Sequence, residues 1–324
     1  MVRLVFKDFR GWHTNDFKNV TLTQVSFDSH PSTAKAFVFF GHVNLDFDGS
    51  PTAYGPAKLN PDDALGNAGN KDQGWFGVAS AATDDPLVKN ETVKIDTTAT
   101  GFITDGKVKF PVVQQAKNGD PKPDFYVSST PHPKGQWYRQ NSYVDASKIA
   151  FGALDRFLQR DHGIKLGDFG LAVRHDQHRE CGFYFVDMGG WNQALGECSH
   201  KVGLELGVTK IKSGKWDNNF PVSFIVFPRS AWAESSWTQL NEELIKKALR
   251  PLLFELSQAE NANDLPMLMA VNEGGPGGIA RGKQGLDTFL KIKGAHARNY
   301  GTVKAALALY GFRTWFHPKP SLIF

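Results

Sequence analysis

Short apolar runs, separated by turn residues, fill the first 230 or so positions of this chain and limit what it can fold into. Residues 36–40 (AFVFF) and 223–227 (SFIVF) are two such runs, and Gly, Asn, Asp and Pro stand between the runs. Runs of this length, rich in β-branched and aromatic residues, are typical of strands rather than helices. We therefore predict a mainly β (α+β) chain with a β-rich domain over residues 1–231.

The pattern changes after residue 232, where apolar residues recur at helical spacing: Leu240, Leu244, Ala248 and Leu252, with Ile245 and Leu249 beside them. Proline removes a backbone donor and clashes inside a helix, so Pro251 is expected to interrupt this one. We predict a helix from about residue 236 to 250 and a kinked turn to about 260. Residues 232–324 are then a helical C-terminal extension packed on the β-rich core.

Two carboxylates frame a short loop in the β-rich part. Residues 181–187 (CGFYFVD) predict a buried strand that ends at Asp187. Residues 197–206 (ECSHKVGLEL), followed by Gly207, predict a helix with Glu197 in its first turn. Two such acids suit general acid/base hydrolysis, although an Asp after a strand and a Glu in a first helical turn are also common as solvated or capping residues.

Four short motifs carry a resemblance that favours the catalytic alternative: residues 143–149 (YVDASKI), 166–168 (LGD), 185–189 (FVDMG) and 195–199 (LGECS). With the acidic segment 45–56 (LDFDGSPTAYGP), the pattern resembles the fungal and bacterial chitosanases of glycoside hydrolase family 75 over residues 37 to 230. The resemblance implies a double-psi β-barrel-like catalytic core without a metal or cofactor. It also implies that Asp187 and Glu197 are the catalytic pair.

The expected activity is inverting cleavage of β-1,4 linkages in an amino-sugar polymer. The dipole of the expected helix would keep Glu197 ionised as the base, and aromatic neighbours would keep Asp187 protonated as the acid. We expect Asp46 and Asp48 to bind sugar groups, the alternative being a surface turn formed by Asp48 and Gly49. The expected substrate-binding set is Asp46, Asp48, Tyr54, Trp75 and Trp191.

Two alternative functions remain. A net charge of +4 attracts anionic peptidoglycan better than cationic chitosan, which favours a peptidoglycan-cleaving glycosidase or lytic transglycosylase. A non-catalytic glycan-binding protein is the second alternative, with sugar rings stacked on Trp75, Trp137 and Trp191. The chain has no run of Lys and Arg typical of nucleic-acid binding, so we expect a polysaccharide partner and no nucleic acid.

Cys181 and Cys198 bracket the two acids and are compatible with a disulfide or with buried, reduced thiols. The N-terminal residues lack the apolar core of a signal peptide, and no stretch approaches the ~18 apolar residues of a membrane span. We expect a soluble protein that acts outside the cell or in the cell envelope, by an export route that the sequence leaves open. A cytoplasmic protein is the alternative, and the oligomeric state is open.

Overall fold

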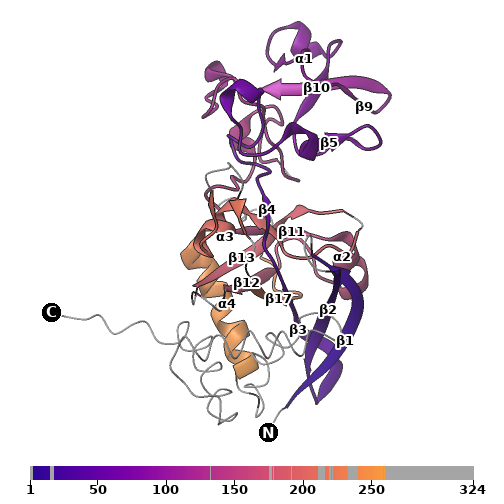
Figure 1. The fold of residues 1–324 in the computed structure, drawn as a ribbon, viewed down its shortest axis with the longest axis vertical. Helices are drawn as coiled ribbons and strands as arrows, with labels where there is room; N and C mark the ends of the chain where they lie inside the picture. Colours follow the sequence, from indigo (N-terminus) through magenta and orange to yellow (C-terminus); the bar gives the residue numbers. More distant parts are fainter. Residues whose placement is uncertain are drawn as a thin grey trace, which may run out of the picture. The chain divides into compact units, whose positions relative to one another are not determined.

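The computed structural model describes residues 3–14, 18–131, 133–174, 177, 179–190, 192–210, 216–218, 220, 222–232, 240–257 and 259. They form two compact units (Figure 1). The first unit contains the described residues up to Leu45, those from Ala150 to Cys198 and those from Val202 onward. The second unit contains Asp46–Ile149 and Ser199–Lys201, so in the sequence it is an insertion into the first.

The first unit is built on a curled nine-stranded sheet that forms a half-barrel (Figure 1). The strand order is β1-β2-β3-β17-β12-β13-β11-β14-β4. The mainly β class is therefore confirmed. The strands are β1 (Leu4–His13), β2 (Lys18–Phe27), β3 (His30–Gly41), β4 (Asn44–Asp46), β11 (Phe151–Leu154), β12 (Phe169–Arg174), β13 (Arg179–Met188), β14 (Glu197–Ser199) and β17 (Val222–Phe227).

The two apolar runs expected to be strands lie side by side at the centre of this sheet, in β3 and β17. All six residues of β17 are buried, which explains a run without polar alternation. Phe39 of β3 pairs with Phe224 of β17, and their rings stack with centroids 4.6 Å apart. The largest fully buried side chains of the unit are Phe37, Phe151, Phe169, Phe183, Tyr184, Phe224 and Phe227.

Two helices and a small hairpin follow or flank the sheet strands: α2 (Arg156–His162), α3 (His200–Glu205), β15 (Thr209–Lys210) and β16 (Trp216–Asp217). Asp155 caps α2 by accepting a hydrogen bond from the Phe157 N–H at 2.8 Å. Gly163 ends α2 in the left-handed conformation. The His162 ring packs against the rings of Phe9 and Phe37, with centroids 4.6 and 5.1 Å apart, so α2 lies against β1 and β3.

The helix expected after residue 232 is α4 (Glu242–Ser257), which packs on β12 and β13. Its first residue is 242 rather than 236; Asn241 precedes it and accepts a hydrogen bond from Leu244 N–H at 3.0 Å. The predicted interruption at Pro251 is wrong, because the helix continues through it. Its buried face consists of Ile245, Ala248, Leu249, Leu253 and Leu256.

Burial of this face stabilises the segment enough to outweigh the lost backbone hydrogen bond at Pro251. A hydrogen-bonded ion pair between Lys35 of β3 and Glu255, at 2.7 Å, adds a further link to the sheet. This part of the expected C-terminal extension therefore belongs to the first unit. Residues 260–324 lie outside the described residues, so the extension as a whole stays a prediction.

The second unit is made of short strands and turns around a small core. Its buried cluster contains Ala79, Ala81, Val93, Val112, Val127 and Tyr138. Strand β10 is the centre of its larger sheet and pairs with β7, β8 and β9. The elements are η1 (Ala57–Leu59), η2 (Leu65–Ala68), β5 (Gly69–Asn70), β6 (Gly74–Trp75), β7 (Ser80–Ala82), α1 (Pro86–Lys89), β8 (Lys94–Ile95), β9 (Phe102–Thr104), β10 (Lys107–Val113), η3 (Ala116–Asn118) and η4 (Gln140–Ser142).

Buried glutamine side chains replace the backbone pairing that such short strands cannot supply. Gln140 donates to the carbonyls of Gly49 and Ser128 and accepts from the Ser128 N–H, with distances of 2.7, 3.1 and 2.8 Å. Gln114 donates in the same way to the carbonyls of Pro51 and Tyr126, at 2.7 and 2.9 Å. Buried backbone groups need partners, and these two side chains supply them where the strands are short.

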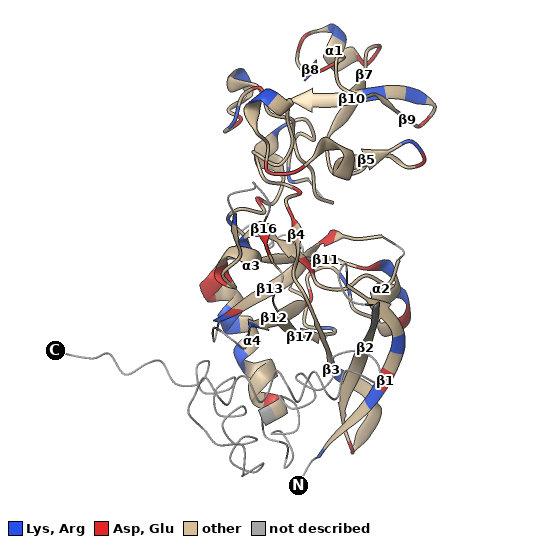
Figure 2. Ribbon diagram, viewed as in Figure 1, with Lys and Arg blue, Asp and Glu red and all other residues tan. Residues whose placement is uncertain are grey.

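Lys, Arg, Asp and Glu are scattered over both units in Figure 2, and α2 and α4 each contain charges of both signs. Within the described ranges, no helix has the length and apolar character needed to cross a membrane.

Candidate functional site

The two predicted catalytic acids reach the same level of the sheet from opposite sides of β11. Asp187 of β13 pairs with Ala153 in the parallel direction. Gly152 pairs with Cys198 of β14 in the antiparallel direction, which places Glu197 beside Ala153 on the other side. Adjacent strands lie about 4.8 Å apart, so two spacings put the Cα atoms of Asp187 and Glu197 about 10 Å apart.

The loop between the two acids is fastened to the junction of β11 and α2. Gly189 N–H donates to the Leu154 carbonyl at 2.9 Å, and Arg156 N–H donates to the Gly190 carbonyl at 3.1 Å. Farther along, Asn192 N–H lies 3.4 Å from Oδ2 of Asp155. These bonds fix the path of the chain from Asp187 to Glu197 as firmly as the strand ladders do.

The same loop is also held by the end of β1. His13 N–H donates to the Gln193 carbonyl at 3.1 Å, and Leu195 N–H donates to the His13 carbonyl at 2.8 Å. The His13 ring adds a contact of 2.6 Å between Nε2 and the Asn192 carbonyl. The first strand of the chain therefore positions a loop that lies about 180 residues away in sequence.

Asp187 is a buried carboxylate with a defined orientation. Its Oδ1 accepts a hydrogen bond from the Met188 N–H at 2.6 Å. A register shift in β13, between the residues that pair with Gly152 and Ala153, leaves Val186 without a counterpart in β11. Such a bulge re-aims the side chains that follow it, here that of Asp187.

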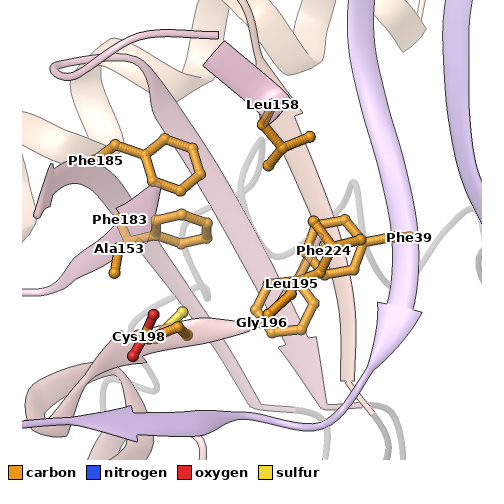
Figure 3. A pocket seen from close by; sticks show the side chains of 11 residues that line it. Phe39, Ala153, Leu158, Phe183, Phe185, Leu195, Gly196, Cys198 and Phe224 are labelled. Atoms are coloured by element: carbon orange, nitrogen blue, oxygen red, sulfur yellow. The ribbon is translucent and has the colours of Figure 1, made fainter. Parts of the chain in front are cut away.

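Glu197 lies in a small apolar pocket (Figure 3). Figure 3 shows Phe183 and Phe185 on one side and the stacked rings of Phe39 and Phe224 on the other. The cavity measures about 10 Å³, room for about one water molecule. The remaining lining residues are Ala153, Leu158, Ala194, Leu195, Gly196 and Cys198.

The predicted position of Glu197 in the first turn of a helix is wrong. It is the first residue of β14, and α3 begins only at His200. The helical spacing from 202 to 206 is local, whereas the pairing of Cys198 with Gly152 is not, so sequence periodicity could not reveal the strand. The expected stop at Gly207 is confirmed: this glycine has a φ of 87° and lies two positions after Glu205, the last residue of the helix.

The surroundings of Glu197 favour its neutral form. Burial in the pocket, and after it the charge of Asp155, raise the pKa of Glu197. The expectation that a helix dipole keeps this group ionised is therefore wrong, since no helix begins there. A glutamate whose pKa is raised is suited to donate a proton, and this reverses the roles expected from the sequence.

Two glycines allow this arrangement. A Cβ on Gly189 would lie 3.3 Å from Oε2 of Glu197. Gly196 has a φ of +85°, and a Cβ there would lie 2.4 Å from the His42 carbonyl oxygen. A side chain at either position would displace the Glu197 carboxyl or the backbone that carries it.

Asp155 is the site residue that the sequence analysis missed. It is 2% exposed and lies between β11 and α2, where its carboxylate caps the helix and reaches the loop. An aspartate directly before a helix is a recognisable cap, and that signal was present in the sequence. Its proximity to Glu197 depends on the register of β11 and β14, which the sequence does not reveal.

The predicted sugar-binding acids belong to the second unit and form a turn. Oδ1 of Asp46 accepts a hydrogen bond from the Asp48 N–H at 2.7 Å, and Gly49 has a φ of +83°. The Tyr54 hydroxyl donates to Oδ1 of Asp48 at 2.6 Å and lies 3.4 Å from Oδ2 of Asp63. A turn is therefore present here, but Asp46 and Gly49 are buried in it, so it is not the surface turn of the alternative. Sugar binding by Asp46 and Asp48 stays a prediction.

Two residues of the predicted substrate-binding set are part of the core of this unit. Tyr54 is 2% exposed, and burial, followed by the charge of Asp48, raises the pKa of its hydroxyl. Trp75 is buried, donates from Nε1 to the Lys109 carbonyl at 2.9 Å, and packs against Phe102. Buried rings have no free face for a sugar, so direct stacking on Trp75 is corrected to a structural role. Substrate binding by Tyr54 stays a prediction. Trp191 lies outside the described residues.

Cys181 and Cys198 are both buried, free cysteines. Cys198 is level with Phe185, because both pair with Gly152. Cys181 precedes Phe185 by four positions, about 13 Å along the strand at ~3.3 Å per residue. A disulfide needs Cα atoms about 4.4–6.8 Å apart, so the reduced alternative holds.

The fold and the site define a mainly β protein with a half-buried, protonatable glutamate and an oriented aspartate on a curled sheet. Comparison with models of known protein families gives no match, and a search of curated proteins finds no similar sequence.

Proposed function

We propose that this chain is a glycoside hydrolase that cleaves β-1,4 linkages in an amino-sugar polymer, with Glu197 as the general acid and Asp187 as the general base. The observation that carries the proposal is the placement of two carboxylates on either side of β11, one with a raised pKa and one held by a backbone N–H. Inverting glycosidases need carboxyl groups about 6.5–9.5 Å apart, and Cα atoms about 10 Å apart are compatible with that spacing.

In this mechanism Glu197 gives its proton to the glycosidic oxygen as the bond from that oxygen to C1 breaks. Asp187 takes a proton from a water molecule whose oxygen attacks C1 from the opposite face. The product is a hemiacetal of inverted configuration, and the two carboxyls have exchanged protonation states. Proton exchange with solvent then restores them.

The resemblance noted in the sequence supports a chitosan-like substrate and a double-psi β-barrel-like core, to which the curled sheet would belong. It also supports action outside the cell or in the cell envelope, where such polymers occur. The family motifs lie where the site is built, since segments 185–189 and 195–199 contain the two acids and the ends of their loop.

The raised pKa of Glu197 also favours a second candidate, a lytic transglycosylase acting on peptidoglycan. In that reaction a single acid suffices, and the product carries an anhydro sugar instead of a reducing end. The positive net charge of the chain supports this substrate.

The test is incubation of the protein with chitosan, chitin and peptidoglycan in separate reactions, followed by mass analysis of the products. We expect reducing-end amino-sugar oligomers from chitosan. Products from peptidoglycan that are lighter than the hydrolysis products by the mass of one water would favour the transglycosylase. Binding to any of the three polymers without products would support a non-catalytic glycan-binding protein and contradict both enzymes.

A further inference from the structure

Asp155 and Glu197 are two acids of the first unit that meet at Gly189. A Cβ on Gly189 would lie 3.3 Å from Oε2 of Glu197 and 3.6 Å from the backbone nitrogen of Asp155. The carboxyl of Glu197 therefore lies against the junction of β11 and α2, where Asp155 is buried. Neither the sequence motifs nor the proposed proton transfers assign a role to Asp155.

We propose that Asp155 is a positioning residue for Glu197, a permanently charged neighbour that keeps the Glu197 carboxyl in its proton-bearing form. This inference rests on the proposed function, because it explains how Glu197 is ready to protonate a leaving sugar. Asp155 itself neither gains nor loses a proton in the reaction.

The hydrogen bonds decide which of the two acids carries the charge. Asp155 accepts from the Phe157 N–H at 2.8 Å and lies 3.4 Å from the Asn192 nitrogen. Burial raises the pKa of Asp155, but backbone N–H groups of Phe157, Asn192, Leu158 and Gln193 lower it in part. Glu197 is surrounded mainly by apolar side chains, so the proton is bound more favourably there.

The geometry also limits which other groups act on Glu197. The Cys198 thiol is the titratable group besides Glu197 among the described lining residues of the pocket. On α2, Arg160 and Asp161 are paired with each other at 2.6 Å, and the His162 ring packs against Phe9 and Phe37. Other titratable groups on the packed strands are Asp187, Tyr184, Cys181, Glu180 and Arg179 of β13, Arg174 of β12 and Lys35 and His30 of β3, with Arg156 on α2.

The charge of Asp155 affects the reaction by raising the free energy of deprotonated Glu197, the form that remains after proton transfer. When Glu197 loses its proton, its carboxylate and that of Asp155 are two like charges near the junction of β11 and α2. Repulsion between them favours proton transfer to the sugar oxygen and return of a proton from solvent afterwards. A neutral residue at position 155 would remove this preference.

The experiment is a pH titration of the full chain labelled with ¹³C at the glutamate side-chain carboxyls, followed by NMR. The Glu197→Gln variant identifies the Glu197 signal. Asp155→Asn keeps a residue that caps helices and removes the charge, and Asp155→Ser is a second variant with the same property. Asp161→Asn, an exposed change on the same helix, is the matched control.

We expect the pKa of Glu197 to fall by at least about one pH unit in Asp155→Asn or Asp155→Ser, since a like charge nearby disfavours ionisation. The control should leave it unchanged. The alkaline limb of the pH profile of kcat/KM should move to lower pH by the same amount. An unchanged Glu197 pKa in a folded Asp155 variant overturns the inference.

The titration and the cleavage assay test the inference about Asp155 and the proposed function separately. If the wild-type chain cleaves a polymer while the Glu197 pKa is the same in both Asp155 variants, the inference is overturned and the proposed function stands. If the pKa falls but the wild-type chain cleaves none of the polymers, the coupling between the two acids stands and the proposed function fails.

Discussion

Asp187 and Glu197 lie on either side of Ala153, one in a strand parallel to β11 and the other in a strand antiparallel to it. Their spacing is therefore set by hydrogen-bond register, not by the length of the loop that joins them. A substitution that moves β11, β13 or β14 by a fraction of a strand spacing changes the relation between the two acids, whereas one on the exposed part of the loop does not.

Gly170→Ala tests the packing behind the acid pocket. A Cβ on Gly170 would lie 2.4 Å from the Phe183 ring, and Phe183 forms a wall of that pocket. We expect the free energy of unfolding in urea to fall by about 1–3 kcal/mol, the usual cost of an overpacked core. Gly190→Ala is the control, since a Cβ on Gly190 would lie 3.6 Å from Cγ of Asn192, an ordinary van der Waals distance. Equal stability of the two variants would contradict this packing.

Glu197→Gln tests the burial of the proposed acid through the pH dependence of stability. The folded-state pKa of Glu197 is above its unfolded value of about 4.3, so the folded chain binds more protons between these two values. Wild-type stability is then lost as pH rises through this window, and Gln avoids the loss.

We expect the Tm of Glu197→Gln to exceed that of the wild type by an amount that grows from about pH 4 to pH 7. Glu243→Gln, a change at an exposed glutamate of α4, should show no such growth. A Tm difference that stays constant or reverses over this range would show that Glu197 is not held in a neutral form.

Substitutions at Asp46 separate the turn from a sugar-binding role. Oδ1 of Asp46 accepts the Asp48 N–H, a bond that Asn also forms and Ala does not. Asp46→Ala is expected to lower the free energy of unfolding by about 1–3 kcal/mol because a buried donor loses its acceptor. Asp46→Asn should keep most of the stability, and a large loss of activity in this variant would support binding of sugar by the charge.

The free cysteines predict that reducing agents have no effect on stability. Cys181 and Cys198 are buried thiols, so addition of dithiothreitol should leave the Tm unchanged. Both thiols should react with a thiol reagent only after unfolding. A lower Tm on reduction, or a protein that is two mass units lighter before reduction than after it, would contradict the reduced state.

The sequence predicted the features that depend on local pattern. Strands β3, β13 and β17 and the helix stop at Gly207 follow from apolar runs and turn residues, and the structure contains them. It did not predict that α4 continues through Pro251, because that depends on how much apolar surface the helix buries against β12 and β13.

The unpredicted part of the site depends on pairing between distant segments. Glu197 is in a strand because β14 pairs with β11, which lies more than 40 residues earlier in the sequence. The proposed role of Asp155 depends on the same pairing. The sequence did not predict that residues 46–149 are inserted into the first unit, because the return of the chain to the large sheet depends on pairing between segments far apart in sequence.

The most direct test of the proposed function is the turnover of Asp187→Asn and Glu197→Gln on the polymer that the wild-type protein cleaves best, with Asp161→Asn as a control. Circular dichroism and Tm establish that each variant is folded. We expect both site variants to lose at least about a hundredfold in kcat, the usual contribution of a general acid or base, and the control to keep wild-type activity. A folded variant of either acid that retains more than about a tenth of the wild-type rate would contradict its assignment to the catalytic pair.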